Sequence, residues 1–150
     1  MTANIYSQLW KKKAMAFAIR THRHLWGKNN EDPLAFLFNQ GLSNEFTKSI
    51  YLGWNKFGQE RQYEKWGINK AGGFIIPPGL VFPHIINKEI MGLFILPLNS
   101  DPEYRIPGSA GTLILLGNPE NTTKRVENLL DGLVLFQDNS DTMSLEIKIP

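Results

Sequence analysis

The sequence predicts an α+β fold in which an N-terminal helical bundle packs on a small, mainly antiparallel sheet, followed by a strand-helix-strand segment. Apolar residues have helical spacing in the first third of the chain, and from residue 74 onward they form short runs of β-branched and large side chains. Of the 150 residues, 42% are hydrophobic, which is enough for a packed core in one domain or two small subdomains.

The first predicted helix covers residues 6–26. Leu9, Phe17 and Leu25 recur near helical spacing, and lysines and arginines between them occupy the other faces. The helix is therefore amphipathic, with its apolar face directed to a core. Gly27 ends it, because glycine readily adopts the left-handed conformation found after helix C-termini.

Two shorter helices are expected next. Asp32 and Pro33 predict a new start, with the aspartate as N-cap and the proline at the first helical position. Gly41 stops this helix, and Ser43 caps a third, short one. The polar and aromatic residues 55–73 are expected to be irregular.

Short apolar runs predict the strands. Asn87 and Lys88 separate two of these runs and predict a β-hairpin. Pro83 and Pro97 cannot donate to a ladder, so we expect them at edges, bulges or strand ends. The predicted strands are residues 74–76, 80–86, 90–96, 112–116 and 144–149, and residues 129–136 fit a helix. The last strand alternates between apolar and charged residues as far as Ile149 and is expected to be half-exposed.

Charge is distributed unevenly along the chain. Residues 1–75 contain 11 Lys and Arg against 5 Asp and Glu, a net of +6, whereas residues 76–150 contain 5 against 9, a net of −4. A basic half favours a polyanion partner, although a helix with a solvated basic face explains the same asymmetry. Because there is no cysteine and no apolar run long enough to span a bilayer, we expect a soluble, cytoplasmic protein without membrane contact.

Basic and aromatic residues interleave after the third predicted helix. Arg61, Lys65 and Lys70 lie among tryptophan, phenylalanine and tyrosine residues. Single-strand binding uses this combination, because cations contact phosphates and rings stack on bases. The three cations are therefore candidate nucleic-acid contacts. The alternative is that the rings, Trp54 above all, fill a helix–sheet interface and that the cations are solvated.

Candidate catalytic groups are sparse. His22 and His24 are two residues apart on a predicted helix, roughly 200° around it, and so cannot share one metal ion. Glu127 and Asp131 are four residues apart near the start of a predicted helix, a spacing typical of surface charge. Two-metal phosphoryl chemistry needs several acids that converge on Mg²⁺, and the spacing indicates no such set.

Several motifs occur in a characteristic order: Gly41-Leu42-Ser43, Leu52-Gly53-Trp54-Asn55, a basic-aromatic stretch at 61–67, Gly79-Leu80-Val81-Phe82-Pro83, and residues 102–109. This order resembles the N-terminal part of the polymerase core of bacterial DNA primases, with the closest similarity to phage- and plasmid-type primase-like proteins. Residues 126–133 look like the opening of a TOPRIM domain, in which a strand delivers a catalytic glutamate and the next helix carries an aspartate.

The resemblance implies roles and a domain division. Glu127 would be the remnant of the catalytic glutamate, and Arg105 would be a further nucleic-acid contact. The implied parts are a helical subdomain at residues 1–55, a small β subdomain of primase-core type at 56–111, and a partial TOPRIM-like segment at 112–150.

Departures from the family pattern limit the activity that the resemblance implies. Residues 94–97 are apolar where arginines are usual, and Glu103 stands where a lysine or arginine is usual. The zinc-binding domain that normally comes first is absent, and the chain ends before the Asp-x-Asp pair that would complete a metal site with Glu127. We therefore expect no cofactor, with Mg²⁺ only if another chain supplies the missing acids, and no primer synthesis by this polypeptide alone.

The sequence leaves three functions open. The first is a truncated or degenerate primase core that binds single-stranded DNA or a primer-template in DNA replication. The second is a protein-interaction or oligomerisation module, which contacts replication proteins or itself through apolar strands such as residues 94–96. The third is an enzyme fragment that another chain completes.

Overall fold

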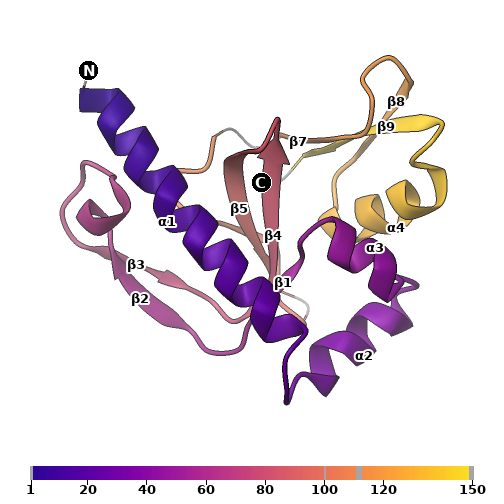
Figure 1. Ribbon diagram of the computed structural model, residues 1–150, viewed down its shortest axis with the longest axis horizontal. Coiled ribbons are helices and arrows are strands. Elements are labelled where there is room, and N and C mark those ends of the chain that lie inside the picture. The colour runs from indigo at the N-terminus through magenta and orange to yellow at the C-terminus, as the bar shows by residue number, and fades with distance from the viewer. Residues whose placement is uncertain (1, 100, 111–112, 149–150) are drawn as a thin grey trace.

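Helices and antiparallel strands combine in one α+β fold, which confirms the predicted class (Figure 1). The computed structural model describes residues 2–99, 101–110 and 113–148. The helices are α1 (Thr2–Leu25), α2 (Glu31–Asn39), α3 (Asn44–Ser49) and α4 (Leu129–Asn139), with a 3-10 turn at Glu64–Trp66. Among the described residues, no helix is long and apolar enough to cross a bilayer.

The strands form three sheets. The central sheet is antiparallel, has the order β1-β4-β5-β6 and consists of β1 (Gly53–Asn55), β4 (Gly79–Ile86), β5 (Glu89–Leu96) and β6 (Tyr104–Arg105). A separate antiparallel hairpin joins β2 (Gln59–Gln62) and β3 (Gly73–Ile76). The third sheet, β7-β9-β8, consists of β7 (Leu113–Leu116), β8 (Thr122–Val126) and β9 (Met143–Lys148). Since β8 and β9 are parallel, α4 is the crossover helix between them.

The central sheet separates two hydrophobic cores. Alternate residues of a strand point to opposite faces, so Leu93 and Ile95 of β5 face α1, whereas Phe94 and Leu96 face the other core. That second core also contains Leu37 of α2 and the apolar residues of α4 and β9. In Figure 1, α1 runs across the sheet, with the β2–β3 hairpin on one side and α2, α3 and α4 on the other.

Helix α1 lies unusually close to strand β1. Thr21 is buried, and its hydroxyl donates to the carbonyl oxygens of Phe17 (2.9 Å) and Ala18 (3.2 Å) within the helix. A Cβ atom on Gly53 would lie 2.8 Å from both the Cβ and the carbonyl carbon of Thr21, closer than real Cβ contacts. Glycine in the Leu52-Gly53-Trp54 motif is therefore a packing requirement of the α1–β1 contact.

A hydrogen bond from a strand of the third sheet to a histidine of the central sheet joins the two sheets. His84 of β4 is buried, and its Nε2 accepts a hydrogen bond from the Leu115 N–H of β7 at 3.2 Å. This bond requires an unprotonated Nε2. Burial lowers the pKa of His84 below its ordinary value, and the nearby Leu115 carbonyl opposes the shift only in part. The neutral imidazole thus links β4 to β7 through this hydrogen bond.

The start of α2 differs from the prediction. The helix begins at Glu31 with Asn30 as the flanking residue, so Asp32 is not the N-cap and Pro33 is the third helical residue. The Asn30 amide makes no cap bond and instead donates to the carbonyl oxygen of Leu25, at the end of α1. Proline is still accommodated, because N–H groups of a first helical turn have no intrahelical acceptor.

Strand β2 was not predicted either, because residues 55–73 were expected to be irregular. Its residues Gln59–Gln62 are all polar or charged, and they are extended because their backbone pairs with β3. The five predicted apolar runs form β3, β4, β5, β7 and β9 within one residue of their predicted starts and ends, as far as they are described, whereas the short strands β1 and β6 were not predicted. Thr112 and Ile149, predicted strand ends, lie outside the described residues.

The predicted hairpin turn and the cap of the third helix are confirmed, whereas Gly27 does not adopt the left-handed conformation expected after the first helix. Asn87 and Lys88 have φ of 51° and 68°, as a two-residue hairpin turn requires. Ser43 caps α3 by accepting the Phe46 N–H at 3.1 Å. Pro83 lies on β4 beyond the part that β1 pairs, next to a bulge.

We expect Gly53→Ala to lower the free energy of unfolding by about 1–3 kcal/mol, because the added methyl group overpacks the α1–β1 contact. Urea unfolding followed by circular dichroism measures this change. Gly58→Ala is the matched control, since a Cβ there meets no atom closer than 3.7 Å. Equal effects of the two substitutions would contradict the close-approach argument.

Acidification should destabilise the fold through His84. Its folded pKa lies below the unfolded value of about 6.5, so the unfolded state binds the proton first and stability falls as pH drops below that value. The loss approaches at most about 1.4 kcal/mol per pH unit. Denaturant midpoints measured between pH 8 and 5 should show a smaller decline in His84→Gln. The same substitution at the exposed His24 controls for the removal of a histidine as such.

Candidate nucleic-acid interface

A basic groove lies between α1 and the β2–β3 hairpin, with a cavity volume of about 420 Å³. Two of its cations come from α1, one from β2 and one from the 3-10 turn. Glu60 is the one carboxylate among the lining residues that the structure describes. We use the name basic groove for the site whose cations are Lys13, Arg20, Arg61 and Lys65 and whose floor includes Phe17 and Trp66.

Aromatic packing sets the position of the hairpin relative to α1. Trp66 is buried, and its ring makes an edge contact with Phe17 of α1 at a centroid separation of 6.3 Å. On its other side Trp66 meets Phe74 of β3 at 5.7 Å. Lys13, Phe17 and Arg20 are spaced i, i+4 and i+7, so they share this flank of the helix. Burial of the rings thus places charges from distant segments along one groove.

Gln59 brings two arginines together. The guanidinium groups of Arg20 and Arg61 both donate to its side-chain oxygen, from Arg20 at 3.4 Å. Two further hydrogen bonds fix the orientation of the Gln59 amide. Its nitrogen donates to the Asn55 side-chain oxygen at 2.7 Å, and the Asn55 side-chain nitrogen donates to the Pro77 carbonyl at 2.9 Å. Two positive groups therefore share a single neutral acceptor.

The positive charge of the groove is not balanced by ion pairs. Within the described ranges the side-chain ion pairs are Lys11–Glu89 and Arg125–Glu146, and neither involves a groove cation. Arg61 donates to the backbone oxygen of its neighbour Glu60, not to a carboxylate. Neighbouring guanidinium groups repel one another, so an anion that bridges them is favoured.

A second hollow of about 340 Å³ adjoins the basic groove at Gln59. We call it the aromatic hollow; it is lined by Arg23, His24, Gly27, Lys28, Asn29, Trp54, Asn55, Lys56, Phe57 and Gln59. Phe57 is 70% exposed, and the Lys56 ammonium lies 5.5 Å from its ring centroid. The Phe57 ring is therefore accessible to a stacking partner, whereas Phe17 and Trp66 are buried. Trp54 is only half-buried.

The predicted nucleic-acid residues fall into three places. Arg61 and Lys65 lie together in the basic groove. Lys70 lines a neighbouring hollow with Glu60 and Glu64, with its ammonium 4.8 Å from the ring of Tyr63. Arg105 pairs with Phe94 across β5 and β6 and so projects from the face opposite α1. The structure therefore does not bring Arg105 to the basic groove.

Three polar residues of the interface were not predicted as contacts. Lys13 and Arg20 were assigned only to the solvated face of the first helix, although their spacing around Phe17 places them on one flank. The sequence around Gln59 does not indicate a binding role. That role depends on Arg20 and Arg61, which donate to its side-chain oxygen only in the folded chain.

Glu127 follows β8 directly and is exposed, and Asp131 is exposed one turn into α4. Asp131 is held through its backbone, whose N–H donates to the Asn128 side chain at 3.0 Å. The carboxylate of Glu103 accepts the Leu129 N–H at 3.0 Å, at the start of α4. No group of three or more potential metal ligands occurs among the described residues. Glu127, Asp131 and Glu103, as the described part of the chain places them, do not form the converging set of acids that a two-metal Mg²⁺ site needs.

Comparison with known proteins connects this fold to primases. No protein-family model matches the chain, and no curated protein sequence matches it. A solved structure of the DnaG primase catalytic domain bound to single-stranded DNA is similar over 95% of this chain and 56% of that domain, with a TM-score of 0.71 and 12% identity. A structure of the DnaG catalytic core gives a TM-score of 0.66 and 14% identity over 93% of this chain and 53% of that core. The chain thus has a primase-like fold and spans about half the length of those domains.

Proposed function

We propose that this chain is a primase-like module that binds single-stranded DNA through the basic groove, in the setting of DNA replication. The primase-like fold supports the replication setting, and one similar structure is of a primase domain bound to single-stranded DNA. The motif order of the sequence supports a phage- or plasmid-type origin.

The arrangement of Arg20, Gln59 and Arg61 carries this proposal. Two guanidinium groups converge on one neutral oxygen in an open groove, without a carboxylate in contact with either of them among the described residues. A phosphate diester supplies the negative charge and the acceptor oxygens that this pair lacks. Lys13 and Lys65 extend the charge along the groove, and Phe57 offers an exposed ring to a base in the adjoining hollow.

Neutralising two groove cations should weaken binding in a salt-dependent way. For Arg61→Ala combined with Lys65→Ala, we expect labelled oligo-dT to bind on the order of 10-fold more weakly at low salt, because two phosphate contacts are lost. The slope of log affinity against log salt, measured by fluorescence anisotropy, should become shallower by about 1.4. The matched control is Lys124→Ala with Lys148→Ala, two exposed lysines of the third sheet. If the parent protein binds no oligonucleotide at low salt, the proposal is wrong.

Gln59→Glu separates nucleic-acid binding from stability. The new carboxylate would sit between the guanidinium groups of Arg20 and Arg61 and compensate their charge. We expect an unchanged or higher melting temperature together with weaker oligo-dT binding and a shallower salt slope. Gln40→Glu, at an exposed glutamine outside the groove, is the matched control and should leave oligo-dT binding unchanged. Tighter oligo-dT binding by Gln59→Glu would show that the two arginines do not contact phosphate.

We further infer that residues 113–148 are a TOPRIM-like segment that does not catalyse by itself. The parallel β8-α4-β9 unit with Glu127 at the end of β8 supports the segment's identity. The inability to catalyse is supported by the acids near Glu127, because Asp131 is the one acid in the first turn of α4 and the Glu103 carboxylate binds a backbone N–H. We expect Mg²⁺ binding to require acids beyond those of the described residues.

Primer synthesis tests this second inference. The protein incubated with Mg²⁺, ribonucleotides and a single-stranded template should yield no oligonucleotide on a denaturing gel. Synthesis that is lost in Glu127→Gln would overturn the inference, because it would show that the site is complete without a second chain.

A role in protein interaction is the second candidate function. The strand first considered for it does not fit, because Phe94, Ile95 and Leu96 are all buried within the chain. Exposed apolar side chains occur instead beside α1, at Ile19 and Tyr51. Phe38, Ile75 and Leu115 are exposed as well, but Ile19 and Tyr51 lie together in one hollow, so we assign the candidate partner surface to this flank of α1.

A further inference from the structure

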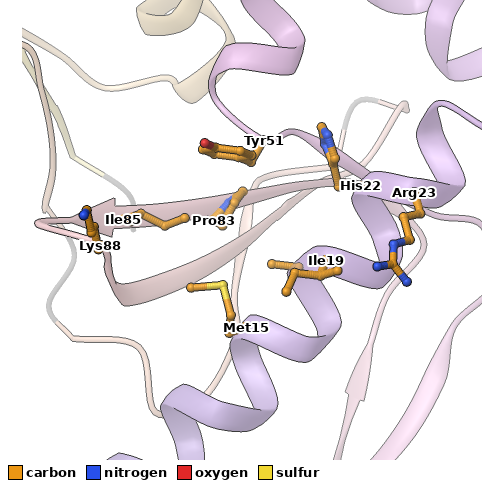
Figure 2. Close-up of a pocket in the computed structure, with 9 residues that line it drawn as sticks. Met15, Ile19, His22, Arg23, Tyr51, Pro83, Ile85 and Lys88 are labelled. Carbon is orange, nitrogen blue, oxygen red and sulfur yellow. The ribbon is translucent and has the colours of Figure 1, made fainter.

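A second groove runs along the other flank of α1 and has a volume of about 520 Å³ (Figure 2). Helix α1 forms one wall and β4 another. Tyr51, the second residue after α3, closes one side. We name this site the apolar groove; it is lined by Met15, Ala18, Ile19, His22, Arg23, Tyr51, Pro83, Ile85 and Lys88. Figure 2 shows Met15, Ile19, Pro83 and Ile85 gathered between the helix and the strand, with Arg23 and Lys88 at opposite ends.

The floor of the groove is aliphatic and accessible. Ile19 is 47% exposed, although its neighbour Ala18 is buried against the sheet. Thioether, isoleucine and proline side chains cannot donate or accept hydrogen bonds usefully, so the groove offers little to the polar edges of nucleobases or to phosphates. Contact with apolar side chains of a protein is the interaction that this floor favours.

Tyr51 supplies an independent observation. It follows the C-cap of α3 with φ of 58°, a left-handed position where glycine is usual and a bulky side chain is strained. The ring is 56% exposed and makes an edge contact with the His22 ring at 5.9 Å. His22 is itself held by a hydrogen bond of 2.9 Å between Nδ1 and the Leu52 carbonyl. An aromatic ring is thus fixed at the wall of the groove where a glycine would fit the backbone better.

The charges around the apolar groove have one sign. Arg23 and Lys88 lie at its ends, and no carboxylate is present among its lining residues. The adjacent Glu89 is engaged by Lys11 at 3.6 Å. A segment that carries acidic residues beside its apolar anchors would therefore complement the groove in both charge and polarity.

The occupant does not add a strand to the sheet. Strand β1 pairs only with residues Gly79 to Val81 of β4, so the rest of β4 has β5 as its strand partner in the described part of the chain. Pro83 lacks an N–H, and a bulge follows between His84 and Ile85. Both features impair an added ladder, so recognition depends on side chains.

We propose that the apolar groove binds an acidic, amphipathic segment of a partner protein. Aliphatic or aromatic residues of that segment insert between Ile19 and Ile85 and pack against Tyr51, while its carboxylates contact Arg23 and Lys88. The site lies on the opposite flank of α1 from the basic groove, so a bound partner segment leaves the basic groove open, although Arg23 also lines the aromatic hollow.

A defined peptide pair tests the site. The probe is a short fluorescein-labelled peptide of alternating aspartate and leucine, and its comparison is the same peptide with lysine in place of aspartate. We expect fluorescence anisotropy to show saturable binding of the acidic peptide and no comparable binding of the lysine peptide. Ile19→Asp should weaken the acidic peptide about 10-fold, and Lys88→Glu several-fold.

Two control substitutions outside the groove and one at Tyr51 distinguish loss of peptide binding from loss of stability. Ile75→Asp, on the exposed face of β3, and Lys148→Glu introduce the same changes away from the groove and should leave peptide binding intact. Tyr51→Gly should lose peptide affinity while its melting temperature is unchanged or higher, because glycine relieves the strained backbone. If Tyr51 instead stabilises the fold, Tyr51→Gly should lower the melting temperature.

Three results would overturn the proposal. One is equal binding of the acidic and lysine peptides, or no binding of either at low salt. Another is competition between the acidic peptide and oligo-dT, which would make the groove part of the nucleic-acid surface. The third is sedimentation that shows a dimer of the protein broken by Ile19→Asp, which would mean that a second copy of the chain covers the groove.

Discussion

The close approach of α1 to the central sheet is the contact on which the rest of the structure depends. The helix presents Ala14, Ala18 and Thr21 to the sheet, all buried, and strand β1 meets it with Gly53. Small residues on both sides let the helix axis lie near the strands, so the larger side chains of α1 are directed to its flanks. Both grooves of the molecule follow from this geometry, one on each flank.

The two grooves differ because different elements face the two flanks. On one side the polar hairpin β2–β3 approaches, held by the buried ring of Trp66, and its arginine and lysine join those of α1. On the other side the apolar end of β4 approaches, with Tyr51 beside it. A helix with cations around most of its circumference thus contributes to a charged site and to an apolar one.

One hydrogen bond, between Glu103 and the start of α4, connects distant parts of this primase-like fold. Glu103, where the related pattern has a basic residue, places a carboxylate at the start of α4, and a negative group is favoured there by the helix dipole. The hydrogen bond joins the segment before β6 to the start of α4.

Local chemistry determined much of the fold from the sequence. The turn at Asn87 and Lys88, the cap at Ser43 and the stop at Gly41 depend on residues adjacent in the chain, so their prediction succeeded. Strand β2 and the start of α2 were missed because their stability comes from β3 and from a bond between Asn30 and Leu25. The tertiary structure alone decided the sites: Arg20 and Gln59 are 39 residues apart and meet only after Trp66 is buried, and Arg105 faces away from them. Sequence reasoning named Arg61 and Lys65 from composition, but which cations converge depends on long-range packing, which no local pattern encodes.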